Sequence, residues 1–243
     1  MTARCFAWLI PLQLLFCVAV HAETIKAVTE ATPYAFISNG EVSGPASAVV
    51  EATLADAGLD YQLGLYPWAR AYDMALQQDN VLIYLIARTP EREQLFKWVG
   101  EVTRYEPHLY KLKARQNIQL STLEDAKNYL IGVVRDDIRH EYLKQQGFTK
   151  LAVAAQNTDN IKLLFNEQIE LLPLSEIDAR RLCDVTGFDF NALERVITLD
   201  DLITGLYLAY SHGTDDSIVE RTRQSFERLR NNGKLDALMS STR

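Results

Sequence analysis

The sequence has little cysteine, little glycine and no excess of positive charge. Its 243 residues include three cysteines and eleven glycines, and Asp and Glu outnumber Lys and Arg to give a formal net charge of −7. A protein that binds nucleic acid needs clustered Lys and Arg to neutralise phosphates, so the acidic balance argues against that class. With 48% hydrophobic and 23% charged residues, the composition is that of a globular protein rather than a disordered or fibrous one.

Only the first 22 residues contain a long apolar run. Arg4 precedes the apolar stretch 5–20, and the small residue Ala22 follows it. This order predicts a secretory signal that is cleaved after Ala22. A signal anchor is the alternative, but Pro11 and Gln13 interrupt a stretch that is already short for a membrane span. We therefore expect an exported, acidic protein that begins at residue 23.

The exported chain would keep a single cysteine, Cys183, which excludes an intrachain disulfide. Short apolar runs alternate with patterns of helical period, which is typical of α/β proteins. The expected strands are 24–28, 61–65, 81–86, 108–112, 129–134, 151–154, 169–172 and 206–210. The expected helices are 46–57, one that begins at Pro67, 121–127, 137–146, 157–165, 174–186 and 215–231. Because the alternation starts again near residue 129 with no linker, we expect two lobes joined by short crossings.

Motifs that carry catalysis are missing. The sequence has no glycine-rich phosphate loop, no nucleophile elbow and no histidine pair at helical spacing. The histidines after residue 22 are His108, His140 and His212, which lie far apart along the chain. We therefore predict no catalytic residues, no metal and no cofactor, and a protein that is not an enzyme.

Two segments that contain arginine are candidates for binding. In the segment 66–72, Trp68 and Arg70 lie within one and a half helical turns; aromatic rings stack on flat ligands, and arginine holds carboxylates through paired hydrogen bonds. The alternative is that Trp68 packs in the core and Arg70 forms a structural ion pair. Arg88 and Arg92 follow the apolar run 81–86, at the carboxyl end of a sheet, where α/β folds hold their ligands.

At these segments the chain resembles the bacterial periplasmic solute-binding proteins of family 3, which include the polar amino-acid receptors of ABC transporters. The resemblance covers nearly all of 23–240. It rests on three segments in order, namely 28–36 with Asn39, Gly40 and Gly44; Thr89-Pro90-Glu91-Arg92; and 207–211 followed by a long helix and 232–235.

The resemblance implies a type II periplasmic binding fold of two lobes that close over a ligand cleft. Lobe 1 would comprise 23–112 and 206–243, and lobe 2 would comprise 113–205. The resemblance makes Arg92 the anchor of a ligand carboxylate. Tyr34, Phe36 and Trp68 would then form the cleft walls, and Glu30 would be a polar contact. It also implies a monomer in the periplasm that works with an ABC permease, or with a membrane sensor.

The chain departs from the amino-acid receptors where they bind the ligand amine. Their amine-binding aspartate comes near Ser175, where only Glu176 is adjacent, and 134–137 replaces their Gly-Thr or Gly-Ser turn. Arg135 adds a positive charge there, and Arg70 or Arg88 could add others. These departures favour an anionic or aromatic carboxylate ligand over a standard α-amino acid. An enzyme of dehydratase type on the same scaffold, with Glu30 or Glu176 as its acid, and a purely structural module are the alternatives.

Overall fold

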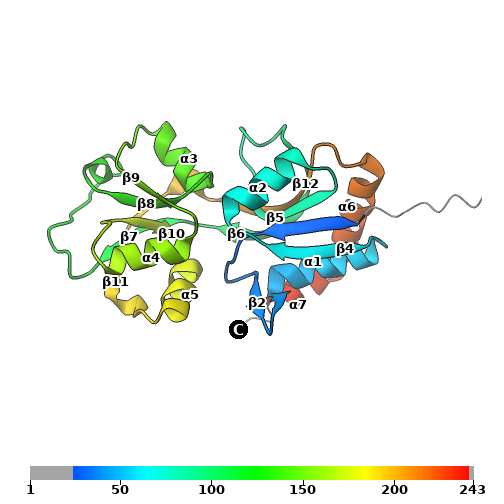
Figure 1. The fold of residues 1–243 in the computed structure, drawn as a ribbon, viewed down its shortest axis with the longest axis horizontal. Coiled ribbons are helices and arrows are strands. Elements are labelled where there is room, and N and C mark those ends of the chain that lie inside the picture. The colour runs from blue at the N-terminus through cyan, green and yellow to red at the C-terminus, as the bar shows by residue number, and fades with distance from the viewer. Residues whose placement is uncertain (1–23, 241–243) are drawn as a thin grey trace, which may run out of the picture.

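The computed structural model describes residues 24–240, which form two lobes side by side (Figure 1). The predicted signal segment 1–22 lies outside the described residues. Lobe 1 is built on a sheet in the order β4-β1-β5-β12-β6. Its strands are β1 (Ile25–Thr29), β4 (Tyr61–Leu65), β5 (Val81–Ala87), β6 (Phe96–Tyr105) and β12 (Thr204–Ser211). Strands β4, β1 and β5 are parallel, while β12 runs antiparallel to both β5 and β6.

Helices cover both faces of this sheet. The helices are α1 (Pro45–Asp56), α2 (Trp68–Gln77), α6 (Asp216–Asn231) and α7 (Lys234–Ser240). Side chains of α1, α6 and α7 pack in one core cluster, and α2 packs in another on the opposite face (Figure 1). Every residue of β5 is buried, since this strand contributes to both clusters. The continuous apolar run 81–86 is therefore the signature of a strand covered on two sides.

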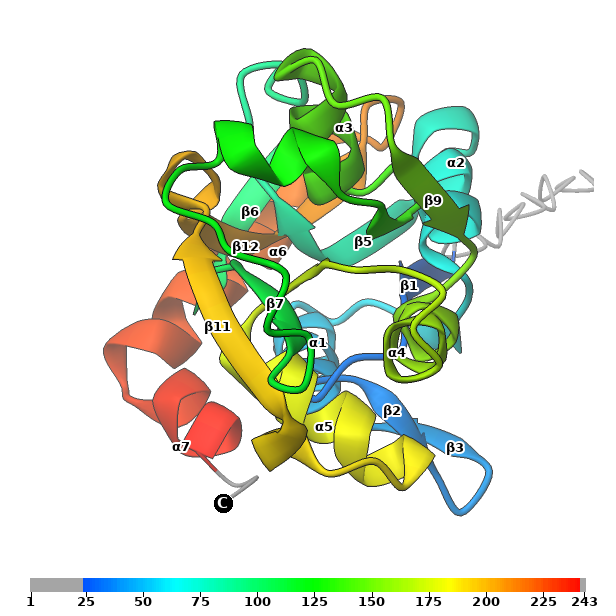
Figure 2. The same cartoon turned by 90° about the vertical axis from the view of Figure 1, so that its left-hand side faces the viewer.

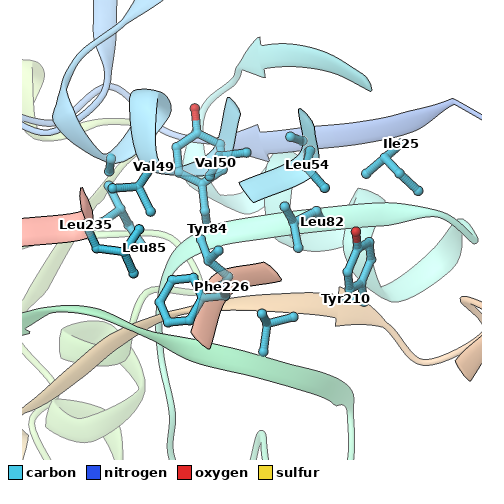
Figure 3. Packing of buried hydrophobic residues seen from close by; sticks show 14 of the residues in the cluster. Ile25, Val49, Val50, Leu54, Leu82, Tyr84, Leu85, Tyr210, Phe226 and Leu235 are labelled. Atoms are coloured by element: carbon cyan, nitrogen blue, oxygen red, sulfur yellow. The ribbon is translucent and has the colours of Figure 1, made fainter. Parts of the chain in front are cut away.

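The larger core of lobe 1 forms around β5 and α6. Tyr84 lies in this core with Leu82, Val49 and Phe226 (Figure 3), and its hydroxyl is 3.1 Å from the Ser47 hydroxyl. A side chain at Gly100 of β6 would place its Cβ 2.1 Å from the Phe226 ring, so only glycine fits there. A short hairpin, β2 (Phe36–Ser38) and β3 (Glu41–Ser43), lies on the side of lobe 1 that is next to lobe 2 (Figure 1).

Lobe 2 contains two smaller sheets with its own helices. Strand β7 (His108–Leu112) pairs antiparallel with β10 (Leu172–Leu174) and β11 (Leu193–Thr198). Strands β8 (Ile131–Val134) and β9 (Leu151–Ala154) are parallel. The helices are α3 (Ile138–Gln145), α4 (Asn157–Phe165) and α5 (Glu176–Thr186). Two core clusters fill this lobe.

The chain passes between the lobes twice, and the first passage corrects the boundary expected from the sequence. Strand β7 pairs only with strands of lobe 2, so 108–112 belongs to that lobe and the passage is at Glu106 and Pro107. The second passage is 199–203, between β11 and β12. Strands β6 and β11 were not expected from the sequence, and the first of them is ten residues long. Within 24–240 no helix is long and apolar enough to cross a membrane.

Candidate ligand-binding cleft

A cavity of about 200 Å³ lies between the lobes. From lobe 1 it is lined by the segment that follows β1, by the end of β5 and by the start of the crossing. From lobe 2 it is lined by the segments that follow β8, β9 and β10, where α3, α4 and α5 begin. The cavity therefore lies where strands end and helices begin, as ligand sites do in open α/β folds.

The deepest charged pair in the cavity wall is Asp137 with Arg139. Both residues are about 5% exposed or less. One oxygen of Asp137 caps α3 by accepting the backbone N–H groups of Arg139 and His140, each at 2.9 Å. The other accepts the Arg139 guanidinium, with Nε at 2.8 Å, and Nη1 of Arg139 donates to the Pro173 carbonyl at 2.9 Å. Lobe 2 thus already supplies acceptors for this arginine.

Two further acidic groups share the cavity without a cation of their own. Glu30 follows β1, and Asp178 accepts the Ser175 hydroxyl at 2.6 Å. Burial raises the pKa of Glu30 to about 8; Arg139 lowers it in part, while Asp137 and Asp178 raise it further. Burial also raises the pKa of Asp178, against the opposing effects of Ser175 and Arg139. Of the arginines that line the cavity, Arg139 is the one that lowers the pKa of both carboxyl groups, while Arg92 and Arg104 lie beside Glu141 and Glu101. With a pKa of about 8, Glu30 keeps its proton at neutral pH.

Arg92 lies at one edge of the cleft and bridges the lobes. Its side chain is buried, and Nη2 donates to Glu141 at 2.9 Å and to the Asp136 carbonyl at 3.2 Å. The indole N–H of Trp68 donates to the same carbonyl at 2.9 Å. The guanidinium also lies over the rings of Tyr72 (4.9 Å) and Trp68 (5.8 Å). Asp136 presents its carbonyl from a left-handed backbone conformation, with φ of 61°.

The opposite edge of the cleft is open. Phe36 of β2 faces α5, and the Arg181 guanidinium lies 5.4 Å from the centre of its ring. Ile177 and Val185 line the same cavity, yet they are 44% and 51% exposed. Arg92 and Trp68 form hydrogen bonds between the lobes at the first edge. Within 24–240, the structure shows no hydrogen bond between the lobes at this second edge.

The structure brings together five of the eight residues that the sequence suggested for binding. The residues that line the cavity are Glu30, Tyr34, Phe36, Trp68 and Arg92. The other three are arginines that do not line it. Arg70 is exposed over the Tyr66 ring, Arg88 pairs with Glu93 beside Trp98 and Tyr207, and Arg135 is exposed at the end of β8.

Sequence reasoning missed Arg139, Asp178, Tyr105 and Arg181, which also line the cavity. Of the two positions considered for an amine contact, Ser175 lines the cavity, while Glu176 is exposed and pairs with Arg180. The spacing Ser175-x-x-Asp178 is a helix-capping pattern, which was a local signal for Asp178. In the described range 24–240, no group of three His, Cys, Asp or Glu side chains could hold a metal ion.

Comparison with known proteins finds similarity in structure only. No protein-family model matches the sequence, and neither does any curated protein. A histidine kinase sensor domain with similarity to periplasmic binding proteins matches with a TM-score of 0.78 at 19% identity, over 88% of this chain and 93% of that one. An amino acid ABC transporter substrate-binding protein from Streptococcus pneumoniae bound to L-arginine matches with a TM-score of 0.76 at 15% identity, over 91% and 94%.

An ancestral arginine-binding protein bound to arginine also matches, with a TM-score of 0.75 at 16% identity, over 90% of this chain and 97% of that chain. The similarity extends over both lobes in each of these structures. The chain therefore has the two-lobed type II fold of periplasmic binding proteins, as expected from the sequence.

Proposed function

We propose that this protein is a periplasmic binding protein that captures a small ligand with a cationic nitrogen, such as an ammonium or guanidinium group. The acidic inner cavity supports this proposal most directly. Glu30, Asp137 and Asp178 line that space, and the arginine that acts on them, Arg139, is already bonded within lobe 2. Two other arginines of the lining, Arg92 and Arg104, lie beside glutamates of their own. A ligand cation would donate hydrogen bonds to these carboxyl groups, and its positive charge would favour their ionised forms. Two of the similar structures contain arginine, a ligand with such a group.

The role of Arg92 as the anchor of a ligand carboxylate stays a prediction. The contacts of Arg92 show what would have to change for a ligand to bind there. Glu141 already holds Nη2 of Arg92 at 2.9 Å, so a ligand carboxylate would have to replace Glu141. The Nε of Arg92 is buried with no hydrogen-bond partner within 24–240. We propose that the ligand is amino-acid-like, with its cationic group at Glu30 and Asp178.

The membrane partner is also part of the proposal. We infer that an ABC permease recognises the ligand-bound form, and the similarity to transporter binding proteins supports this inference. The similarity to a histidine kinase sensor domain supports a sensor protein as the second candidate. In either role the domain acts as a monomer that binds and releases its ligand unchanged.

A thermal-shift comparison of cations and anions tests the charge of the ligand. With the purified protein we expect arginine, lysine and alkyl diamines to raise the melting temperature, and simple dicarboxylates to leave it unchanged. The variants Glu30→Gln and Asp178→Asn should lose most of the shift, because each removes a carboxyl group that a bound cation would hold in its ionised form. Glu176→Gln is the matched control, since that carboxylate is exposed and pairs with Arg180 outside the cavity. A shift with dicarboxylates alone would overturn the proposal.

The pH dependence of stability provides a second test. The pKa of Glu30 is about 8 in the folded protein and 4.5 for an ordinary glutamate. Between these pH values the unfolded chain has lost this proton and the folded protein keeps it, so the stability of the ligand-free protein falls as pH rises through this window. Melting temperatures measured from pH 5 to 9 should fall less for Glu30→Gln than for the wild type. Parallel curves would show that Glu30 is not protonated in the folded state.

A further inference from the structure

One face of α5 presents apolar side chains and an arginine at the open edge of the cleft. Ile177, Arg181 and Val185 are spaced by four residues, so they lie along one side of the helix. Ile177 and Val185 are 44% and 51% exposed although both line the cavity. The hairpin that carries Phe36 lies next to α5 (Figure 2). The two lobes thus face each other here with apolar surface that water still reaches.

The charge at this edge is positive and lacks a carboxylate partner. Arg181 forms no ion pair among the residues that the structure describes, while its neighbour Arg180 is bonded to Glu176 at 2.6 Å. Arg104, the other exposed arginine in the cavity lining, lies 3.9 Å from Glu101. The Arg181 guanidinium is held over the Phe36 ring at 5.4 Å, a geometry that leaves its N–H donors available to a ligand.

The open edge and the acidic inner wall belong to one continuous cavity. Asp178 and Arg181 are on the same helix and both line that cavity. Three residues of helix rise separate them by about 4.5 Å along the axis, and Asp178 is half-buried while Arg181 is exposed to solvent. The cavity therefore has an acidic floor, apolar side walls and a basic mouth.

We propose that the residues Phe36, Ile177, Arg181 and Val185 form an outer subsite that binds the apolar segment and the distal carboxylate of the ligand. This inference rests on the proposed function, which places the ligand cation at the floor. With the ligand cation at Glu30 and Asp178 and its carboxylate at Arg181, the exposed apolar side chains of Ile177 and Val185 would contact the part of the ligand between the two charged groups. The ligand class is a zwitterion whose cationic nitrogen and carboxylate are separated by an apolar chain, as in an ω-amino acid or in lysine through its side-chain ammonium.

Calorimetry with two matched probes tests the outer subsite. Aminohexanoate and hexylamine have the same six-carbon chain and terminal ammonium group, and only the first has a distal carboxylate. A charge-assisted hydrogen bond to Arg181 should make aminohexanoate bind about tenfold more tightly than hexylamine. In Arg181→Gln this preference should fall to about one. Arg135→Gln is the matched control, because Arg135 is an exposed arginine of the same lobe outside the cavity.

The outcomes separate the two proposals. If both probes bind the wild type with equal affinity, and Glu30→Gln weakens both, the acidic floor is supported and the outer subsite is refuted. An aminohexanoate preference that persists in Arg181→Gln also refutes the outer subsite. If neither probe binds the wild type, the proposed function fails and the outer subsite fails with it. Since Arg181 is exposed, its replacement should leave the melting temperature of the free protein unchanged, which verifies that the variant is folded.

Discussion

The two edges of the cleft differ in how they join the lobes. At one edge, Arg92 and Trp68 of lobe 1 donate three hydrogen bonds to Asp136 and Glu141 of lobe 2, all within 3.2 Å. At the other edge, the contact between lobes is the Phe36 ring beneath Arg181, at 5.4 Å. We refer to the first as the bonded edge and to the second as the open edge.

This difference indicates which contacts need a ligand. The bonded edge joins Nη2 of Arg92 and the Trp68 indole N–H to acceptors of lobe 2, so it contributes to the stability of the ligand-free protein. The open edge leaves apolar side chains and a guanidinium exposed, and it gains partners only when a ligand or further closure covers it.

Removal of Arg92 should have the largest effect on the free protein. We expect Arg92→Ala to lower the free energy of unfolding by about 2–3 kcal/mol, because it leaves Glu141 without its donor, removes one of the two donors to the Asp136 carbonyl and removes the contacts over Tyr72 and Trp68. Chemical denaturation measures this change. The radius of gyration by small-angle scattering should also rise, since the lobes lose a link.

Arg88→Ala is the matched control for this prediction. Arg88 also pairs with a glutamate, Glu93, and lies over two aromatic rings, but all of these contacts are within lobe 1. Because this pair is exposed, its loss should reduce stability by less than about 1 kcal/mol and leave the radius of gyration unchanged. Equal effects of the two variants would mean that the Arg92 bridge does not hold the lobes together.

A smaller effect is expected when one hydrogen bond of the bonded edge is removed. Trp68→Phe keeps an aromatic ring under Arg92 but removes the N–H donor to Asp136, so we expect a loss of about 1 kcal/mol. Trp98→Phe is the control, since the Trp98 indole donates to Glu93 inside lobe 1 at 3.1 Å. Backbone hydrogen exchange at the start of α3 should accelerate in the first variant and not in the second.

The sequence predicts the elements whose signals are local. The alternating pattern of 61–65, the apolar run 81–86 and the capped helix after Asp137 all appear in the structure close to their expected bounds. Strand β6 was missed because its pairing with β12 contains two register shifts, which break the alternation of buried and exposed residues. Gly100 in its middle suggests a turn, whereas its function is to make room for Phe226, a residue 126 positions later in the chain.

The site could be predicted only as far as residue types and strand ends allow. Segments after β1 and β5 reach the cleft because the ends of parallel strands meet at one edge of a sheet. The order of strands and helices along the sequence was enough to predict this. The sequence could not show that Arg92 already has an ion-pair partner. Glu141 lies 49 residues from Arg92 along the chain, and the two meet through the packing of the lobes. The acidic floor likewise depends on Glu30 and Asp178, which come from different lobes.

The smallest effect on the free protein is expected at the open edge. Ile177→Ser replaces an apolar side chain that is already 44% exposed, so the free energy of unfolding should change by less than about 0.5 kcal/mol. The affinity for a zwitterion with an apolar chain, such as aminohexanoate, should nevertheless fall, because the variant removes part of the apolar surface that covers this chain. Denaturation and calorimetry on the same preparation measure both quantities. A loss of stability comparable to that of Trp68→Phe would show that the open edge already joins the lobes without a ligand, and the distinction between the edges would then be lost.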